Sequence, residues 1–353
     1  MGSPVVRRTV MSAIRGSLRM GAILAAATAL GADAPAKPFT RATVAAELRD
    51  RYPHFAFPPD ELPKGVGASE NVVYAQVDGT ALALDLYTPE AGGPFPAILI
   101  VHGGGWESGN RCMERPLAAH LAALGYAAAP ADYRLGAAGR FPAALRDLKS
   151  AVCWLRAHAW ERRIDPGRIA AVGASSGGQL VALLGATNGA PEFEGDVGEQ
   201  AGLSGVQAVV DIDGLADFTD PELVRQQEVC PSAPAHFLGG PFATRASVWR
   251  AASALTHVGP RSAPTLFINS TAPTPILPGR AAMCDRLRAL GIDSEIVVIP
   301  DTPHPFWLVD PWFDRTVAEI DRFLRRHFAV PAADSRREHP VLPARKPAPP
   351  DLP

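Results

Sequence analysis

Apolar residues in the middle of the chain fall in short runs separated by longer amphipathic stretches. Val72–Val77 and Leu82–Tyr87 alternate apolar and polar residues around Asp78-Gly79, which predicts an antiparallel hairpin. Ala97–Val101 is continuously apolar, as in a strand buried on both faces, and further strands are predicted over Ala127–Tyr133, Ile169–Val172, Val206–Ile212, Thr265–Asn269 and Glu295–Ile299. Helices are predicted over Pro116–Leu124, Pro142–Glu161, Gln179–Ala186, a stretch near Arg280–Leu290, and Thr316–Phe328. This alternation predicts an α/β fold with a mostly parallel, doubly wound sheet and an antiparallel hairpin at its edge.

The two ends of the chain lack these patterns. Residues 1–34 are expected to be a signal peptide, and residues 35–68 a proline-rich linker or N-terminal arm. Residues 331–353, rich in proline and charge, are expected to be a disordered tail. One domain is expected over residues 69–330. Within it, residues 214–262 show no strong strand pattern, so we expect them to form a small cap or insertion.

The signal-peptide prediction rests on charge followed by apolar residues. The apolar run Met20–Leu30 is preceded by positive charge from Arg7, Arg8, Arg15 and Arg19. Ala32 and Ala34 follow it with the spacing of a cleavage site. We therefore expect a secreted or periplasmic protein; the alternative is a frayed amphipathic N-terminus. The run is shorter than the roughly 20 residues of a membrane span, and no later segment qualifies as one.

Composition narrows the remaining classes of function. The chain has 353 residues, of which 47% are hydrophobic and 20% charged, so it can bury a large core. Its formal net charge is -2 and its basic residues are dispersed, which argues against a nucleic-acid partner. The four cysteines lack the spacing of a zinc site. Cys112 and Cys230 lie in predicted loops, where an oxidising compartment would allow a disulfide; the pairing and the oligomeric state are left open.

A serine stands where a buried strand is predicted to turn into a helix. The sequence there is Gly173-Ala174-Ser175-Ser176-Gly177-Gly178. A nucleophilic serine needs a sharp turn that projects its oxygen above the sheet, and flanking glycines let strand and helix approach. The central position of the G-x-S-x-G pattern makes Ser175 the candidate nucleophile. The alternatives are a plain glycine- and serine-rich turn and a phosphate-binding turn.

A glycine loop follows the first buried strand. It reads His102-Gly103-Gly104-Gly105-Trp106, and its amides would be unobstructed by side chains. Acyl transfer places negative charge on a former carbonyl oxygen, which such amides stabilise. We therefore predict an oxyanion hole from the backbone N–H groups of Gly104, Gly105 and Ser176. His102 is expected to brace the loop, and Trp106 to line the substrate pocket or simply to pack.

The candidate general base is His304, in the loop Pro300–Phe306 after the last predicted strand. The order serine before histidine suits this serine motif, and a neutral imidazole would take the serine proton. The orienting acid is harder to assign, because the usual loop after Thr265–Asn269 carries no carboxylate. Asp213, after the preceding strand, is the first choice. The alternatives are Asp211, Asp217, Asp301 or a bare serine–histidine pair.

Taken together, these motifs resemble the α/β-hydrolase esterases of the hormone-sensitive-lipase and bacterial feruloyl/acetyl-xylan esterase (BD-FAE-like) type. The resemblance rests on His102–Trp106, Tyr133–Leu135, Phe141–Ala144, Asp147, Trp154-Leu155, Ile164–Ile169 and Gly173–Gly178. It implies an α/β-hydrolase fold over most of residues 70–330 and a serine carboxylesterase that needs no cofactor. The chain departs from the family at the acid, where Pro273 or Thr274 stands in place of an aspartate.

The resemblance also implies a substrate: a carboxylic ester with a short, acetyl-like acyl group on a sugar or polysaccharide. Phe306, Trp307 and Trp312 follow His304 and are candidates for an aromatic platform under sugar rings, although such residues more often pack in a core. Two other interpretations stay open at this point. One is a serine peptidase of the same fold, and the other is a catalytically silent binding protein on a hydrolase scaffold.

Overall fold

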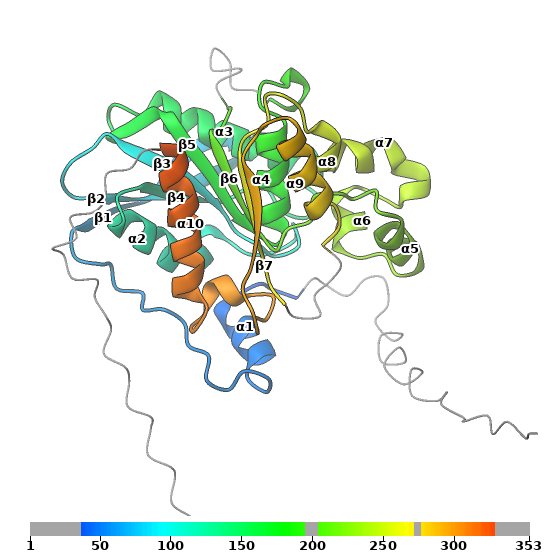
Figure 1. The fold of residues 1–353 in the computed structure, drawn as a ribbon, viewed down its shortest axis with the longest axis horizontal. Coiled ribbons are helices and arrows are strands. Elements are labelled where there is room, and N and C mark those ends of the chain that lie inside the picture. The colour runs from blue at the N-terminus through cyan, green and yellow to red at the C-terminus, as the bar shows by residue number, and fades with distance from the viewer. Residues whose placement is uncertain (1–36, 195–203, 272–276, 329–353) are drawn as a thin grey trace, which may run out of the picture. The chain divides into compact units, whose positions relative to one another are not determined.

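The computed structural model describes residues 37–194, 204–271 and 277–328 (Figure 1). Within these residues one eight-stranded sheet has the order β1-β2-β4-β3-β5-β6-β7-β8. Its strands are β1 (Val66–Val77), β2 (Thr80–Pro89), β3 (Phe95–Val101), β4 (Ala127–Ala131), β5 (Ile164–Ala174), β6 (Ala208–Ile212), β7 (Thr265–Asn269) and β8 (Ser294–Val298). β2 pairs antiparallel with β1 and β4, and the pairs from β4 to β8 are parallel. The predicted α/β fold with an opening hairpin is confirmed.

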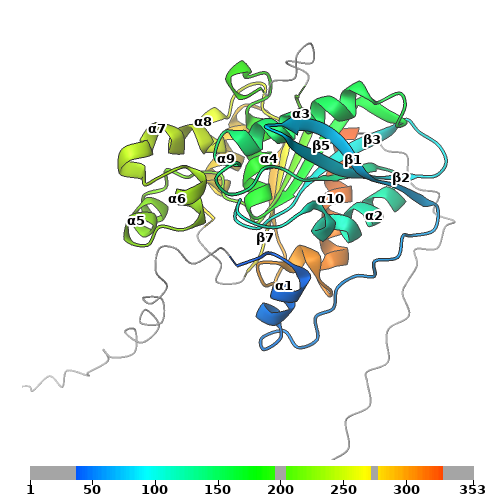
Figure 2. The same cartoon turned by 180° about the vertical axis from the view of Figure 1, so that it is seen from behind.

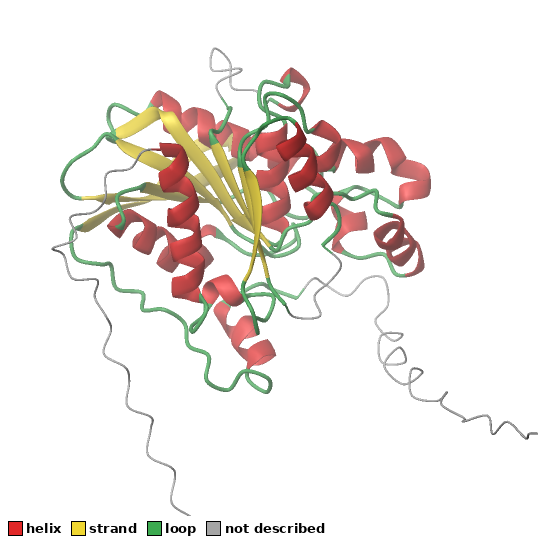
Figure 3. Cartoon of the chain, viewed as in Figure 1, coloured by secondary structure: helices red, strands yellow, loops and turns green. Residues whose placement is uncertain are grey.

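Helices cover both faces of this sheet (Figures 1 and 3). Alternate residues of a strand point to opposite faces, so Leu99 and Val101 of β3 enter one core while Ile98 and Ile100 enter the other. The first core is closed by α3 (Ala143–Ala157), α4 (Ser176–Ala186) and α9 (Arg280–Ala289). The second is closed by α1 (Arg41–Leu48), α2 (Arg115–Ala123) and α10 (Phe313–Phe328). This double coverage explains why the inner strands are almost continuously apolar.

Residues 214–262, expected as a cap, contain four short helices between β6 and β7. These are α5 (Pro221–Val229), α6 (Ala233–Phe237), α7 (Phe242–Ala252) and α8 (Ala254–His257), and they lie together beyond α4 and α9 (Figures 1 and 2). Their interior is aromatic: Phe218 packs against Phe237 and Trp249. The absence of a strand pattern in the sequence is thus matched by a helical insertion.

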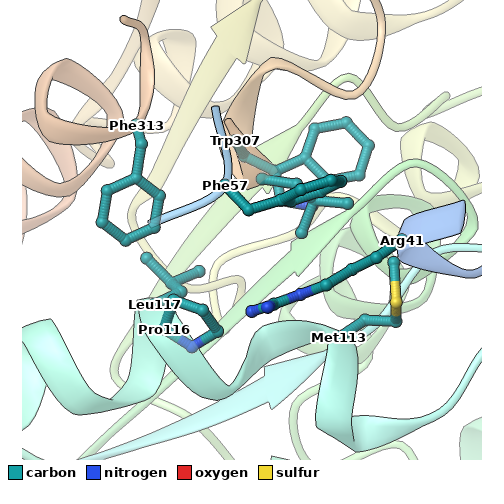
Figure 4. Close-up of a pocket in the computed structure, with 8 residues that line it drawn as sticks. Arg41, Phe57, Met113, Pro116, Leu117, Trp307 and Phe313 are labelled. Atoms are coloured by element: carbon teal, nitrogen blue, oxygen red, sulfur yellow. The ribbon is translucent and has the colours of Figure 1, made fainter. Parts of the chain in front are cut away.

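Residues 37–62, expected as a linker or arm, lie against the second core. Arg41 pairs with Asp60 at 2.6 Å and lies over the Phe57 ring, 5.2 Å from its centroid. Figure 4 shows Arg41 and Phe57 of this segment lining one pocket together with Trp307 and Phe313. We refer to residues 37–62 as the N-terminal arm. It contains α1, a helix that the sequence analysis did not predict.

Other differences concern element ends. α4 begins at Ser176, three residues before the prediction, because the serine turn leads directly into the helix. α10 begins at Phe313 rather than Thr316, and α3 ends at Ala157 rather than Glu161. The predicted signal peptide and tail lie outside the described residues. Of the helices that the structure describes, none is long and apolar enough to cross a membrane.

Candidate active site

Ser175 stands on a sharp turn between β5 and α4. Its φ of 55° lies in the left-handed region, which is costly for a residue with a side chain. The turn is fixed by the Ser175 amide, which donates to the Ile212 carbonyl at 2.8 Å. A Cβ on Gly173 would collide with the Gly177 carbonyl, and one on Gly177 with the Val101 carbonyl. The glycines of the motif are therefore required by close approach of backbone segments.

Ser175, His304 and Asp213 form a continuous hydrogen-bonded chain. His304 Nε2 lies 2.9 Å from Ser175 Oγ, and His304 Nδ1 lies 3.0 Å from Asp213 Oδ2. Because a carboxylate only accepts, Nδ1–H donates to Asp213, which leaves Nε2 free to accept the serine proton. The two ends of this chain are 129 residues apart in sequence. The fold brings them together because β5, β6 and β8 all end at the same edge of the parallel sheet.

Asp213 itself is held firmly. It is 1% exposed, its Oδ1 accepts the Ser270 amide at 2.8 Å, and its own amide donates to Ile268 at 3.0 Å. Burying a carboxylate without hydrogen-bond partners is costly, and these contacts supply them. Its φ of 49° places it, like Ser175, in the left-handed region. The turn after β6 thus aims the carboxylate at the imidazole.

The alternative acids lie elsewhere. Asp211 is fully buried and pairs with Arg280 at 3.1 Å; burial raises its pKa to about 6, against the lowering effect of that arginine. Asp217 accepts from the amide and hydroxyl of Thr219 at 2.7 Å. Asp301 is exposed. Of the four candidate carboxylates, Asp213 is the one that bonds to His304.

The glycine loop lies beside the serine. A Cβ on Gly103 would come within 3.2 Å of Ser175 Cβ, so loop and nucleophile are in contact distance. Among the described residues, the amides of Gly104 and Gly105 donate no hydrogen bond. Ser176 is the first residue of α4, where a helix amide has no intrahelical acceptor. All three predicted oxyanion-hole amides are therefore available to a ligand.

His102 supports this loop from inside the protein. It is 1% exposed, and its Nδ1–H donates to the Gly103 carbonyl at 2.7 Å. Its ring stacks on Tyr133 at 4.5 Å, and the Tyr133 hydroxyl donates to the His102 carbonyl at 3.1 Å. Burial lowers the pKa of His102, which keeps the imidazole neutral. These contacts fix the backbone from which the glycine amides project.

The aromatic residues differ from their predicted roles. Phe306 and Trp307 are 0% exposed, so the prediction that they form a substrate platform is wrong; both belong to the second core. Trp307 lies edge-on to the His304 ring at 5.5 Å and supports the histidine from behind. Trp312 packs edge-on against Tyr52 at 5.3 Å.

Trp106 is 5% exposed and stacks on Phe237 at 4.8 Å. It borders a cavity of about 210 Å³ together with Glu107, Arg140 and His236.

Two residues near the site escaped the sequence analysis. Arg280 is a buried arginine whose importance depends on partners distant in sequence. Phe39, in the N-terminal arm, has its Cβ 3.2 Å from the position a Cβ on Gly104 would take. No local pattern marks either residue. The described cysteines, Cys112 and Cys230 among them, are all free thiols in this structure.

Glu114 is a buried acid behind the histidine. It is 1% exposed, its Oε1 accepts from Trp307 Nε1 at 3.3 Å, and burial raises its pKa from 4.5 to about 8. Between these values the unfolded state binds fewer protons, so rising pH favours unfolding. We expect Glu114→Gln to be increasingly stabilising from pH 4.5 to pH 8 and constant above, by up to about 5 kcal/mol at about 1.4 kcal/mol per pH unit.

The measurement is urea unfolding of both proteins at several pH values. The exposed Glu61→Gln serves as the control and should show no such trend. A stability difference for Glu114→Gln that is the same at pH 5 and pH 8 would contradict a buried, protonated carboxyl.

Comparison with known proteins fits this geometry. The BD-FAE family model matches residues 84–280. The probable carboxylic ester hydrolase LipM of Mycobacterium tuberculosis is 29% identical over 69% of this chain and 57% of its own length, and the esterase LipC of the same organism is 30% identical over 62% and 54%. The chain thus spans little more than half the length of these curated relatives.

Solved structures give the same picture. The butyrate-bound esterase 2 of Thermogutta terrifontis is 26% identical over 74% of this chain and 94% of its own, with a TM-score of 0.62. A truncated carbohydrate esterase from gut microbiota is 23% identical over 77% and 99%, with a TM-score of 0.65, and supports the fold alone. Because the family model covers more than half of the sequence, the chain belongs to the BD-FAE family.

Proposed function

We propose that this protein is a secreted serine hydrolase of carboxylic esters. The observation that carries the proposal is the hydrogen-bonded chain Ser175–His304–Asp213, with distances of 2.9 and 3.0 Å, beside a glycine loop whose Gly104 and Gly105 amides donate no hydrogen bond among the described residues. Proton transfer requires heavy atoms about 2.6–3.2 Å apart, and both distances meet this condition. The names of the curated relatives LipM and LipC, a carboxylic ester hydrolase and an esterase, support the same class of reaction.

The reaction would follow from the geometry in two halves. Ser175 Oγ attacks the ester carbonyl while His304 Nε2 takes its proton, and Asp213 stabilises the imidazolium that forms. The amides of Gly104, Gly105 and Ser176 bind the oxyanion. His304 then returns the proton to the leaving alcohol, which leaves an acyl-enzyme. In the second half a water molecule, activated by the same histidine, releases the acid.

For the substrate we propose esters with short, acetyl-like acyl groups, on carbohydrates or related alcohols. The glycine loop is confined on two sides. Phe39 Cβ lies 3.2 Å from the Cβ position of Gly104, and Ala233 Cβ of the cap lies 3.3 Å from that of Gly105. Structures of the Thermogutta terrifontis esterase 2 hold butyrate and propionate. The gut-microbiota protein of similar fold is a carbohydrate esterase. Export, proposed from the N-terminal sequence, would suit a large extracellular substrate.

The test is a panel of p-nitrophenyl esters from acetate to octanoate, a set of acetylated sugars, and peptide anilides, together with labelling by a fluorophosphonate. The proposal predicts labelling and fastest turnover of the short esters. Turnover of peptides alone would instead favour a serine peptidase of this fold. Absence of labelling in well-folded protein would favour a silent scaffold.

The position of Phe39 leads to a prediction about acyl length. Its amide donates to Ser108 Oγ at 3.1 Å, which anchors the backbone, and its ring comes within 3.7 Å of the position that a Cβ on Gly103 would take. We expect Phe39→Ala to raise kcat/KM for octanoate relative to acetate by about tenfold. Apolar pockets discriminate between substrates that differ by one methylene by roughly 1–3 kcal/mol of transition-state binding, and removing the ring would remove such a barrier to the longer chain. The ester panel measures this ratio. Phe55→Ala, in the same arm but with its ring packed on Phe57, should leave the ratio unchanged; an unchanged ratio in Phe39→Ala would refute the proposed wall.

A further inference from the structure

We propose that Arg280 is the positioning residue that allows the turn after β6 to supply the acid of this site; the inference rests on the proposed function. Arg280 is the first residue of α9 and is 2% exposed. It lies outside the chain of groups that would exchange protons with the substrate. Its role would be to hold the backbone on both sides of Asp213 in the conformation that points the carboxylate at His304.

The guanidinium makes four hydrogen bonds, all to the backbone or side chains around Asp213. Nη1 donates to Asp211 Oδ1 at 3.1 Å and to the Gly214 carbonyl at 2.6 Å. Nη2 donates to the Asp211 carbonyl at 2.9 Å and to the Ile268 carbonyl at 3.0 Å. The planar, forked shape of an arginine suits such a set, and a lysine could satisfy only part of it.

These acceptors are the ones that define the acid's position. Asp211 and Gly214 flank the turn, and the Gly214 amide returns a hydrogen bond to Asp211 Oδ1 at 2.7 Å. Ile268 of β7 also accepts the Asp213 amide, at 3.0 Å. One cation therefore ties together both sides of the turn and the neighbouring strand. Asp213 has a φ of 49°, in the left-handed region that residues with a side chain rarely adopt, so its surroundings must hold this conformation.

The same network packs against α4, the helix that begins directly after the nucleophile Ser175. A Cβ on Gly178 would collide with Asp211 Oδ1, and one on Gly214 would collide with the Gln179 amide. The acid-bearing turn is thus packed directly on the first turn of α4, three to four residues after Ser175. A shift of the turn would change the distance between acid and base, and it would also disturb the Ile212 carbonyl that holds the Ser175 amide.

Stability alone is a weak reason for such a pair. Asp211 and Arg280 have side chains 0% and 2% exposed, and removing both charges from water costs several kcal/mol. Well-packed apolar residues often replace buried ion pairs at no loss of stability. What an apolar pair could not do is bind the carbonyls of residues 211, 214 and 268 at once. The polar pair is therefore best explained by the precise backbone geometry it imposes beside Asp213.

The test compares Arg280→Met and Arg280→Lys with Arg286→Met, a matched control six residues along α9 whose arginine donates to the Leu255 carbonyl at the surface. Each protein is measured for kcat and KM on a short ester, for melting temperature, and for the downfield proton signal of a histidine Nδ1–H bonded to a carboxylate. We expect Arg280→Met to lower kcat about 100-fold with KM little changed, as for displacements of about 1 Å in other enzymes. The downfield signal should disappear, Arg280→Lys should restore part of both, and Arg286→Met should match the wild type.

A melting temperature that falls while kcat per folded molecule and the proton signal stay normal would overturn the inference, since Arg280 would then be merely structural. If Arg280→Met does not fold, Arg280→Lys decides by the same two readouts. A wild-type protein that hydrolyses no ester would count against the proposed function only. The proton signal, compared between the wild type and the Arg280 variants, would still test the inference.

Discussion

Ser175→Ala is expected to lower kcat on short esters by about 10⁶-fold and to abolish fluorophosphonate labelling. The serine hydroxyl is the group that would form the acyl-enzyme, and removal of such a nucleophile elsewhere has an effect of this size. The remaining rate would come from the oxyanion amides and binding alone. The fold should be unaffected, since alanine removes one oxygen from a half-buried position.

Ser176→Ala provides the matched control. Its hydroxyl is buried, whereas its backbone amide, which the substitution keeps, is the proposed oxyanion donor. We expect kcat within about threefold of the wild type, because the substitution leaves in place the backbone amide that would bind the oxyanion. Loss of activity in Ser176→Ala, with normal turnover in Ser175→Ala, would show that Ser176 is the nucleophile and that Ser175 was wrongly assigned.

Asp213→Asn is expected to lower kcat by about 10⁴-fold, with the hydrolase folded. The amide would present a donor or a neutral acceptor to His304 Nδ1, which favours the wrong tautomer and leaves Nε2 protonated toward Ser175. The measurement is kcat between pH 6 and pH 9, with circular dichroism to establish folding.

Two carboxylates provide controls for this experiment. Asp217 bonds to Thr219, and Asp301 is exposed, so Asp217→Asn and Asp301→Asn should keep kcat within a few-fold of the wild type. A large loss in either variant, combined with near-normal turnover of Asp213→Asn, would reassign the acid. Asp211 is unsuitable as a control because it supports the same turn through Arg280.

The parts of this protein that the sequence predicts are those with a local physical signature. The strand–turn–helix around Ser175 needs glycines at close approach, and buried parallel strands need continuous apolar runs; both are visible along the chain. His304 could be selected from nine histidines because chain order and the last strand specify its loop. These predictions depend on residues that are neighbours in the sequence, and such residues remain neighbours in the folded protein.

Chain position made Asp213 the first choice for the acid but could not exclude the neighbouring aspartates. Asp211, Asp213 and Asp217 lie within seven positions, and only the left-handed turn at Asp213 determines which carboxylate faces the imidazole. The aromatic platform failed for a related reason. Phe306 and Trp307 follow His304 directly, but the backbone turns them into the core, where α2 and the N-terminal arm cover them. Phe39 and Arg280 act on segments far from them in sequence, which no single-chain pattern reveals.

The loop that carries the proposed base follows β8, the strand at the edge of the sheet. Within the described residues β8 pairs on one side only, with β7, and it is partly open to solvent. Its outer support includes the Arg322–Glu295 pair at 2.9 Å, a surface contact that contributes at most about 1 kcal/mol and weakens with salt. Fraying of this single strand would withdraw the imidazole while the central strands stay paired. Activity would then be lost when β8 detaches from β7, under conditions milder than those that unfold the whole domain cooperatively.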